Sequence, residues 1–168
     1  MVKEVYFEKI AIDDMIWLVQ ASENALKRID LIDKADSSTL HETPNDITNL
    51  TIRQLKEYFI GNRAHFDIPL DISGYSTFSQ KIWNILLTIP YGKTISYKEL
   101  ADRTGDVKCI RAAATANGRN PIPIIIPCHR VIGSDGGLTG YSLGLDIKKY
   151  LLNIEQPGRY SDVQMQLF

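Results

Sequence analysis

Cys128 and His129 are adjacent in the C-terminal half of the chain, and Glu155 follows them. A thiol reacts as its thiolate, and an imidazole that takes up the thiol proton is a common way to form a thiolate near pH 7. A buried cysteine is more often an inert apolar side chain. Glu155 favours reactivity, because a carboxylate can orient the imidazole that deprotonates the thiol. The three residues predict a Cys, His, Glu relay with Cys128 as nucleophile.

The segment before Cys128 must hold it in a fixed place. Residues 120–127 contain three prolines, which exclude a helix, so we expect an irregular or strand-like buried segment. Neighbouring side chains of a strand point to opposite faces. We therefore expect a bridging water molecule, rather than direct contact, between Cys128 and His129.

A loop and a helix separate this dipeptide from Glu155. Five glycines between Gly133 and Gly144 predict the loop. Asp146 begins a last helix that ends at Ile154, so Glu155 is expected just beyond the helix.

Two short helices joined by a tight turn are predicted upstream. Ser96 and Glu99 match a capping box at the start of a helix over residues 96–103, and Asp106 can cap a second helix over residues 107–116. This outline is that of a helix-turn-helix. The second helix carries basic residues and alanines, so it can approach a nucleic acid closely. The alternative is that its alanines pack against the core of a small helical domain.

The first half of the chain predicts a small sheet and a helix. Residues 16–19 and 26–32 are apolar, and the turn-prone Ser-Glu-Asn triplet between them predicts an antiparallel hairpin. An acidic, polar stretch over residues 33–46 follows. Apolar residues then recur at helical spacing from Ile47 to Phe59 and stop before Gly61.

The fold class that follows is α/β (α+β), in two domains. Residues 1–73 form the small antiparallel sheet with its helix. Residues 74–168 form a mostly helical domain, which begins with a helix over residues 78–87 and contains the helix-turn-helix and the cysteine.

The charge of the chain is divided unevenly between these halves. The net charge is −1, but residues 1–74 carry 8 Lys and Arg against 13 Asp and Glu, while residues 75–168 carry 11 against 7. Residues 93–130 alone carry 7 basic and 3 acidic side chains. The second half could therefore face phosphates, although an ordinary solvated surface with a chance asymmetry gives the same count.

Other classes of protein are disfavoured. The two cysteines, Cys109 and Cys128, lack metal-ligand spacing, so we expect no metal and no cofactor. No apolar run approaches the ~20 residues of a membrane span, and the N-terminus does not read as a signal peptide. We expect a cytoplasmic protein without a membrane partner.

The segment from Arg111 to Glu155 resembles the O6-alkylguanine-DNA alkyltransferases, also called methylated-DNA-protein-cysteine methyltransferases. The Pro-Cys-His-Arg-Val block at residues 127–131 carries the resemblance, together with Asn-Pro at 120–121 and Gly-Tyr-Ser at 140–142. The similarity extends upstream, through Pro-Tyr-Gly-Lys-Thr at 90–94 and Ser-Tyr at 96–97, to about residue 78. The N-terminal half is similar only as a sheet-and-helix domain of the ribonuclease H-like type.

The resemblance implies direct DNA repair by a suicide reaction. The Cys128 thiolate would take the alkyl group from O6-alkylguanine irreversibly, once per molecule, after the base is flipped out of the duplex. His129 would act as the water-mediated base, Glu155 would orient it, and Asn120 would brace the active-site segment. The protein would act as a monomer on double-stranded DNA, which it would bind in the minor groove.

The resemblance also implies contacts to DNA and to the flipped base. Tyr97 would push on the phosphate and donate toward guanine N3, Arg111 would fill the vacated space in the duplex, and Ser142 would donate to O6. The full predicted set for substrate and DNA is Tyr97, Lys108, Arg111, Ala112, Ala113, Arg119, Leu138, Tyr141 and Ser142.

One departure from the family pattern and two rival functions remain. Ala114 stands where the family commonly has glycine, which bears on how closely the helix approaches DNA. A non-enzymatic lesion sensor of the same fold would bind and flip the base, but such relatives lack the acceptor cysteine. A Cys-His hydrolase would need an oxyanion hole, and the helix-turn-helix and Arg111 have no part in that function.

Overall fold

The computed structural model describes residues 4–160. The chain divides into two compact units, Met1–Gly74 and Tyr75–Phe168. Each unit is described by itself below.

The first unit is a three-stranded antiparallel sheet with two helices. Its strands are β1 (Tyr6–Ile12), β2 (Met15–Ala21) and β3 (Leu26–Ile32), in the order β1-β2-β3. The predicted hairpin is β2 and β3. The sequence does not predict β1, because its charged residues interrupt the apolar alternation that marks a strand.

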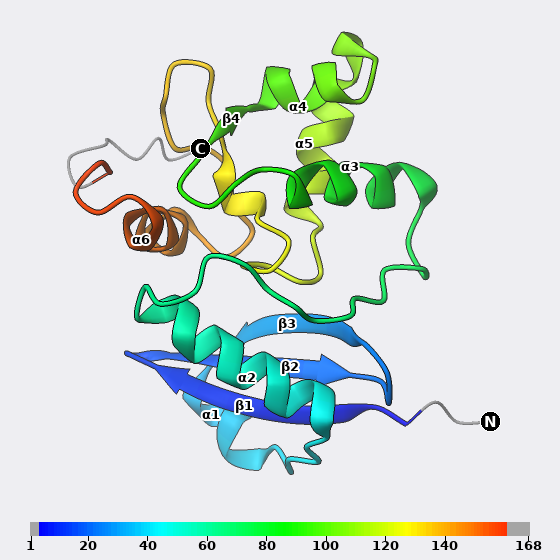
Figure 1. Ribbon diagram of the computed structural model, residues 1–168, viewed down its shortest axis with the longest axis vertical. Helices are drawn as coiled ribbons and strands as arrows, with labels where there is room; N and C mark the ends of the chain where they lie inside the picture. Colours follow the sequence, from blue (N-terminus) through cyan, green and yellow to red (C-terminus); the bar gives the residue numbers. More distant parts are fainter. Residues whose placement is uncertain (1–3, 161–168) are drawn as a thin grey trace. The chain divides into compact units, whose positions relative to one another are not determined.

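The helix α2 (Asp46–Phe59) packs against the sheet (Figure 1). Asn45 caps it by accepting a hydrogen bond from the Thr48 amide, and the Thr48 hydroxyl accepts one from the Asn45 amide. The acidic stretch before it is not entirely irregular, because a short helix, α1 (Lys34–Thr39), begins after Asp33.

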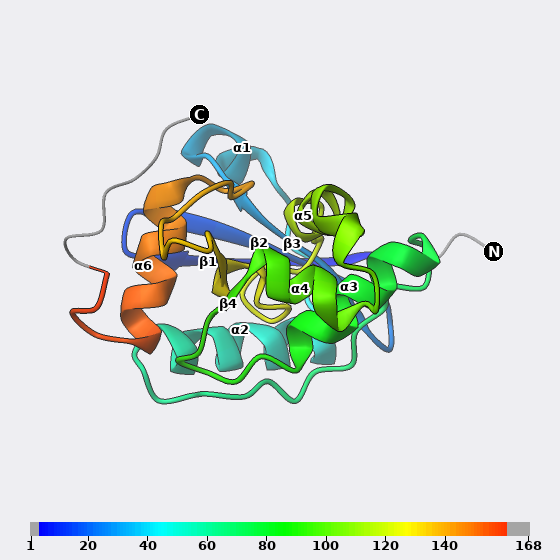
Figure 2. The same ribbon diagram turned by 90° about the horizontal axis from the view of Figure 1, so that it is seen from above.

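The second unit is mostly helical (Figures 1 and 2). The predicted helix-turn-helix consists of α4 (Tyr97–Arg103), a 3-10 turn (Val107–Cys109) and α5 (Ile110–Gly118). The helix α3 (Thr77–Leu87) packs against α5, where the buried indole of Trp83 donates to the Ala116 carbonyl oxygen at 2.9 Å.

The cap of α4 differs in part from the predicted capping box. The Ser96 hydroxyl accepts from the Glu99 amide at 3.0 Å, as predicted. The Glu99 carboxylate, however, pairs with Arg103 one turn later, at 2.6 Å. An arginine at this spacing competes for the carboxylate.

Two segments of the second unit bring the chemical residues together. The short strands β4 (Ile95–Ser96) and β5 (Val131–Ile132) pair in parallel, which sets the start of α4 beside the end of the 3-10 turn Cys128–Arg130. The last helix, α6 (Leu145–Glu155), contacts that same turn.

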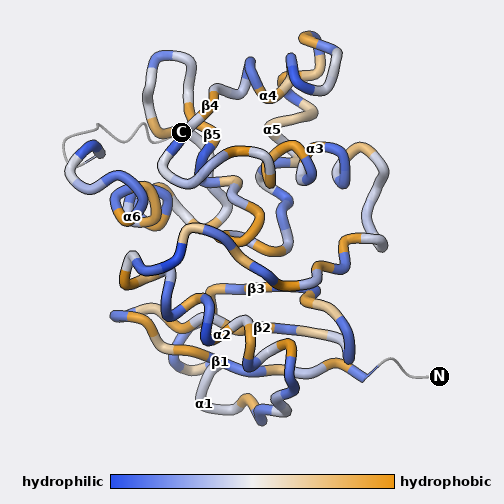
Figure 3. Tube along the Cα trace, in the orientation of Figure 1, coloured by the Kyte–Doolittle hydropathy of each residue, from blue (hydrophilic) through white to orange (hydrophobic). Residues whose placement is uncertain are grey.

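The proline-rich segment over residues 120–127 is irregular and buried throughout. It forms a turn in which the Ile126 amide donates to the Ile122 carbonyl oxygen at 2.9 Å. Ile124 adopts a φ of +75°, which is rare for a β-branched residue. The segment is one of the hydrophobic stretches of the second unit in Figure 3.

Within the described residues, no helix combines the length and apolar character that crossing a bilayer requires.

Candidate active site

The sulfur of Cys128 is buried at the start of a 3-10 turn, not on a strand. The side chain is 1% exposed. Asn120 holds it, because its Nδ2 donates to the sulfur at 3.0 Å and to the Ile126 carbonyl oxygen at 2.7 Å. The Asn120 Oδ1 accepts from the Ile122 amide at 2.9 Å. One buried amide therefore fixes both the nucleophile and the segment before it.

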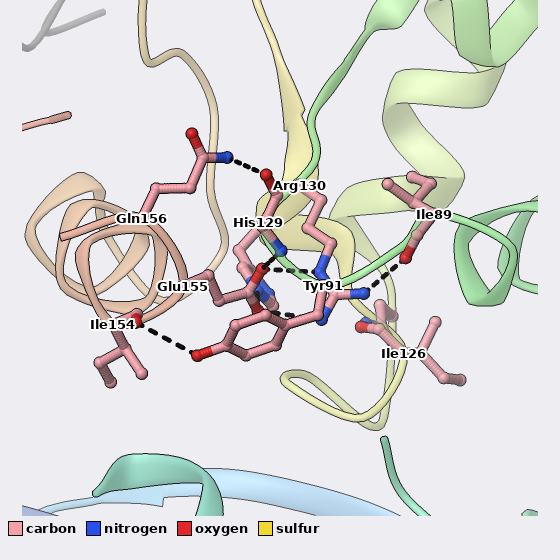
Figure 4. A network of polar contacts seen from close by, with 10 residues as sticks. Ile89, Tyr91, Ile126, His129, Arg130, Ile154, Glu155 and Gln156 are labelled. Atoms are coloured by element: carbon pink, nitrogen blue, oxygen red, sulfur yellow. Dashed lines mark hydrogen bonds and ion pairs between the residues drawn. The ribbon is translucent and has the colours of Figure 1, made fainter. Parts of the chain in front are cut away.

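His129 contacts the carboxylate that the sequence predicts for it (Figure 4). Its Nε2 lies 2.8 Å from the Glu155 Oε1, with both side chains buried. A carboxylate only accepts hydrogen bonds, so Nε2 carries the proton and Nδ1 keeps its lone pair. Nδ1 is buried and has no hydrogen-bond partner among the described residues. Glu155 is the last residue of α6 rather than a residue beyond it.

Arg130, which the predicted set omits, completes this network. Its Nε and Nη2 donate to the two oxygens of Glu155 at 2.9 and 3.0 Å, and its Nη1 donates to the Ile89 carbonyl oxygen. The Gly92 amide donates to the same carboxylate at 3.1 Å. Glu155 thus accepts four hydrogen bonds. The signal that could have identified Arg130 is its place directly after the Cys-His pair.

The loop of Tyr91 and Gly92 secures the end of α6. The Tyr91 hydroxyl donates to the Ile154 carbonyl oxygen at 3.2 Å, and Gln156 donates to the Gly92 carbonyl oxygen (Figure 4). Gly92 has a φ of +70°, and a Cβ there would lie 3.2 Å from the carbonyl oxygen of Glu155. Any other residue at this position would therefore be strained.

Burial and interactions with neighbouring groups shift the pKa values of Cys128, His129 and Glu155 in opposite directions. Burial raises the pKa of the Cys128 thiol, while Asn120, Tyr141 and Lys148 act to lower it. Burial lowers the pKa of His129, which keeps the imidazole neutral at pH 7. Burial alone would raise the pKa of Glu155, but the hydrogen bonds from His129 and Arg130 and the charge of Arg130 lower it to about 2.

Tyr97 and Lys148 share a hydrogen-bond acceptor, the Thr139 carbonyl oxygen. The Tyr97 hydroxyl donates to the carbonyl oxygens of Thr139 and Gly140 at 3.2 and 3.1 Å, and burial raises its pKa to about 12. The Lys148 ammonium donates to the same Thr139 oxygen at 2.9 Å and lies 5.7 Å from the centre of the Tyr97 ring.

Lys148 is fully buried and is not among the site residues predicted from the sequence. The spacing of Lys148 along α6 could have indicated its burial. Lys148 shares a face with Leu151, Leu152 and Glu155, all of them buried. Ile147, Tyr150 and Ile154 also fit a helical period but are only half-buried, so the apolar residues alone do not mark the buried face of this helix.

The predicted DNA-contacting residues fall into two groups. Lys108, Arg111, Ala112 and Arg119 are exposed along the 3-10 turn, α5 and its C-cap. Ala113, which the predicted set also includes, is fully buried, so its side chain is not part of this exposed surface. Ala113 follows Ala112 by one position on the helix, and this rotation turns the methyl group of Ala113 toward the core.

The predicted pocket residues differ in exposure. Leu138 is buried in a cluster with Ile132, Leu152 and Tyr160, so only its backbone is suited to contact a substrate. Tyr141 is half-buried and Ser142 is exposed. Both cysteines are free, and Cys109 lies 3.2 Å from the Thr104 hydroxyl.

Comparison with known proteins identifies the family of this chain. The family model described as "6-O-methylguanine DNA methyltransferase, DNA binding domain" matches residues 77–157, and the model of its "ribonuclease-like domain" matches residues 16–72. A methylated-DNA-protein-cysteine methyltransferase of Mycobacterium tuberculosis is 45% identical over 131 residues, which cover 77% of this chain and 79% of that protein. This chain belongs to the 6-O-methylguanine DNA methyltransferase family.

Other members of the 6-O-methylguanine DNA methyltransferase family agree. The relative from Methanosarcina barkeri is 54% identical over 104 residues, which cover 62% of this chain and 65% of that protein. The crystal structure of the M. tuberculosis O6-methylguanine methyltransferase matches with a TM-score of 0.79 at 39% identity, over 91% of this chain and 93% of the other. The M. tuberculosis protein OGT, solved in complex with DNA, matches with a TM-score of 0.79 at 39% identity, over 89% and 92%.

Proposed function

We propose that this protein repairs DNA by transferring the alkyl group of O6-alkylguanine irreversibly to Cys128. The observation that carries the proposal is the network around the sulfur. A single buried thiol accepts a hydrogen bond from Asn120, and it is followed in sequence by an imidazole whose protonated nitrogen is committed to Glu155. This arrangement suits a one-time nucleophile.

The first step is the formation of the thiolate. His129 is neutral at pH 7, and its Nδ1 lone pair is available to accept a proton. No hydrogen bond joins His129 to the Cys128 sulfur in the part of the chain that the structure describes. A water molecule would relay the proton from the thiol to Nδ1, and Glu155 would stabilise the imidazolium that forms.

The second step is the transfer itself. The thiolate attacks the alkyl carbon in line with the O6–carbon bond, a carbon–sulfur bond forms, and the carbon–oxygen bond breaks. The electron pair leaves with guanine, which gains one proton, in balance with the proton that the thiol gave to His129. A thioether has no comparable route back to a thiol, so each molecule acts once.

The burial of Cys128 requires the base to leave the duplex. A substituent on O6 cannot reach a side chain that is 1% exposed while the guanine remains stacked. Tyr97, Tyr141 and Ser142 would line the pocket for the flipped base, with the carbonyl groups of Cys128 and Leu138 as acceptors for its amine. The pKa of about 12 keeps Tyr97 protonated, so it can donate to guanine N3.

The exposed face of α5 would bind the minor groove. Arg111, Ala112, Thr115, Gly118 and Arg119 are all exposed and share one side of the helix. Small side chains between two arginines allow close approach to the phosphates, and Arg111 would occupy the space that the base vacates. Lys108 extends this surface. Minor-groove contacts carry little sequence information, which suits a protein that must act at any sequence.

Intact-mass spectrometry after incubation with an O6-methylguanine duplex tests the proposal. We expect one added methyl group, located on the Cys128 peptide. The Cys128→Ala variant should bind DNA but gain no mass, while Cys109→Ala, the matched control at the other cysteine, should gain it normally. Methylation of the Cys128→Ala protein, or none of the wild type after saturating exposure, would contradict the proposal.

A further inference from the structure

Asn117 is a buried amide on α5, the helix whose exposed face is proposed to bind DNA. Its side chain is 2% exposed. Its Nδ2 donates to the Cys128 carbonyl oxygen at 3.4 Å, whereas its Oδ1 is buried and has no hydrogen-bond partner among the described residues. Burying an acceptor without a donor is costly, so the presence of this amide beside the nucleophile calls for a physical explanation.

The Asn117 amide is directed at the 3-10 turn that carries the nucleophile. The Cys128 carbonyl oxygen accepts from the Asn117 Nδ2 and also from the Val131 amide, which closes the turn. A carbonyl oxygen has two lone pairs, and both are engaged here. The Asn117 Oδ1 is bonded to the same carbon as Nδ2, so it lies close to that carbonyl oxygen. It is an acceptor with both lone pairs to spare.

Asn120 contacts the same cysteine but has no such spare acceptor. Its Nδ2 donates to the Cys128 sulfur at 3.0 Å, and its Oδ1 accepts from the Ile122 amide at 2.9 Å. Both ends of the Asn120 amide therefore serve the active-site segment. Asn117 differs, because only its donor end is used within the described part of the chain.

The donor that fits the Asn117 Oδ1 is the exocyclic amine of guanine. A flipped base that presents its O6 substituent to the Cys128 sulfur carries one exocyclic amine, and this amine is also the proposed donor to the Cys128 carbonyl. An amide oxygen only accepts hydrogen bonds, so it gains nothing from a purine that has hydrogen in place of the amine. Sites built to pair with a substrate donor reject analogues that lack it.

We propose that Asn117 makes alkyl transfer specific for guanine, because its Oδ1 accepts a hydrogen bond from the exocyclic amine of the flipped base beside the Cys128 carbonyl. The inference rests on the proposed alkyl transfer and names the part of the base that the site recognises. Cys128 and Asn117 are both buried, so the movement that admits a base to the sulfur would have to expose the amide as well. The second hydrogen of the amine remains for the carbonyl group of Leu138.

The kinetic test compares two free alkyl donors that differ only in this amine, O6-benzylguanine and 6-benzyloxypurine. Wild type should react at least ~5-fold faster with O6-benzylguanine, the factor that one hydrogen bond typically supplies. In Asn117→Leu, which has a similar volume and no acceptor, the rate with O6-benzylguanine should fall by a similar factor, while the rate with 6-benzyloxypurine stays nearly unchanged. The ratio of the two rates in one sample does not depend on how much of the protein is folded.

Asn84→Leu, at an exposed asparagine of α3, is the matched control and should keep the wild-type ratio. Equal slowing of Asn117→Leu with both donors would overturn the proposal, because it would give Asn117 a structural role alone. Equal rates of the wild type with the two donors would overturn it as well, and that measurement needs no variant of Asn117.

A crystal structure of Cys128→Ala bound to an O6-methylguanine duplex gives a second test. We expect the Asn117 Oδ1 to lie within about 3.2 Å of the exocyclic nitrogen of the flipped base. A flipped base whose amine lies beyond about 3.5 Å from Oδ1 would overturn this inference and leave alkyl transfer intact. Wild-type protein that gains no benzyl mass from O6-benzylguanine would instead contradict the proposed function.

Discussion

Replacing Arg130 by methionine should destabilise the second unit, because it leaves Glu155 buried without its permanent cation. The variant removes both hydrogen bonds to the carboxylate and the bond to Ile89. Since His129 is neutral at pH 7, Arg130 supplies the charge that holds Glu155 ionised. Breaking a buried ion pair from one side costs about 3–5 kcal/mol.

The pKa of Glu155 gives an upper limit for the contribution of Arg130, because His129 lowers this pKa as well. Its pKa falls from the usual 4.5 to about 2 in the folded protein. At about 1.4 kcal/mol per unit, the ionised carboxylate stabilises the fold by about 3 kcal/mol at pH 7. Because the folded pKa is depressed, this stability is present above pH 4.5 and is lost as the pH falls toward 2, with about 1.4 kcal/mol left at pH 3.

Urea unfolding of wild type and Arg130→Met at pH 7 and pH 3 checks this reasoning. With a denaturant dependence of about 2 kcal/mol/M, the midpoint should fall by about 1.5 M at pH 7, and the difference should shrink at pH 3. Arg103→Met is the matched control, because it breaks an exposed Arg-Glu pair and should cost under about 0.5 kcal/mol. Adding Glu155→Gln to Arg130→Met should recover part of the loss. A loss at pH 7 no larger than that of the control, or one independent of pH, would refute the role of the ion pair.

Three further changes should have distinct outcomes. Lys148→Met should raise the free energy of unfolding by up to about 3 kcal/mol at pH 7, because the pKa of Lys148 in the folded protein, about 8, lies below the usual 10.5. This gain should vanish as the pH rises from 8 to 10.5. Urea titrations at pH 7 and pH 10 measure it. Arg111→Ala should weaken binding to an O6-methylguanine duplex and slow transfer from it, yet leave the rate with free O6-benzylguanine nearly unchanged; equal slowing of both reactions would exclude a role in base flipping. Gly92→Ala should cost about 1–2 kcal/mol by thermal unfolding, because φ is +70° and the new Cβ would meet the carbonyl oxygen of Glu155 at 3.2 Å, whereas Gly74→Ala, which meets nothing within 4 Å, should cost less.

Local sequence signals determine much of the fold. Proline, glycine and capping residues act over a few neighbours, so the helices α2 to α5, the β2–β3 hairpin and the irregular segment before Cys128 follow from the sequence. Strand β1 does not follow from the sequence, because charged side chains interrupt its apolar pattern. Helix α1 does not follow either, because it is only six residues long. Their stability depends on tertiary packing, which no local pattern records.

The family and the candidate residues of the relay can be read from the amino-acid sequence, because the Pro-Cys-His-Arg-Val block, Asn120 and Glu155 are visible there. The surroundings of the sulfur follow instead from the tertiary fold. Arg130 neutralises Glu155, Lys148 lies buried against two tyrosine rings, and Ala113 turns inward. Burial and the pairing of charges depend on tertiary contacts between segments that are distant in the sequence. Here α6 contacts the 3-10 turn of Cys128, and the spacing of residues along the chain does not predict this contact.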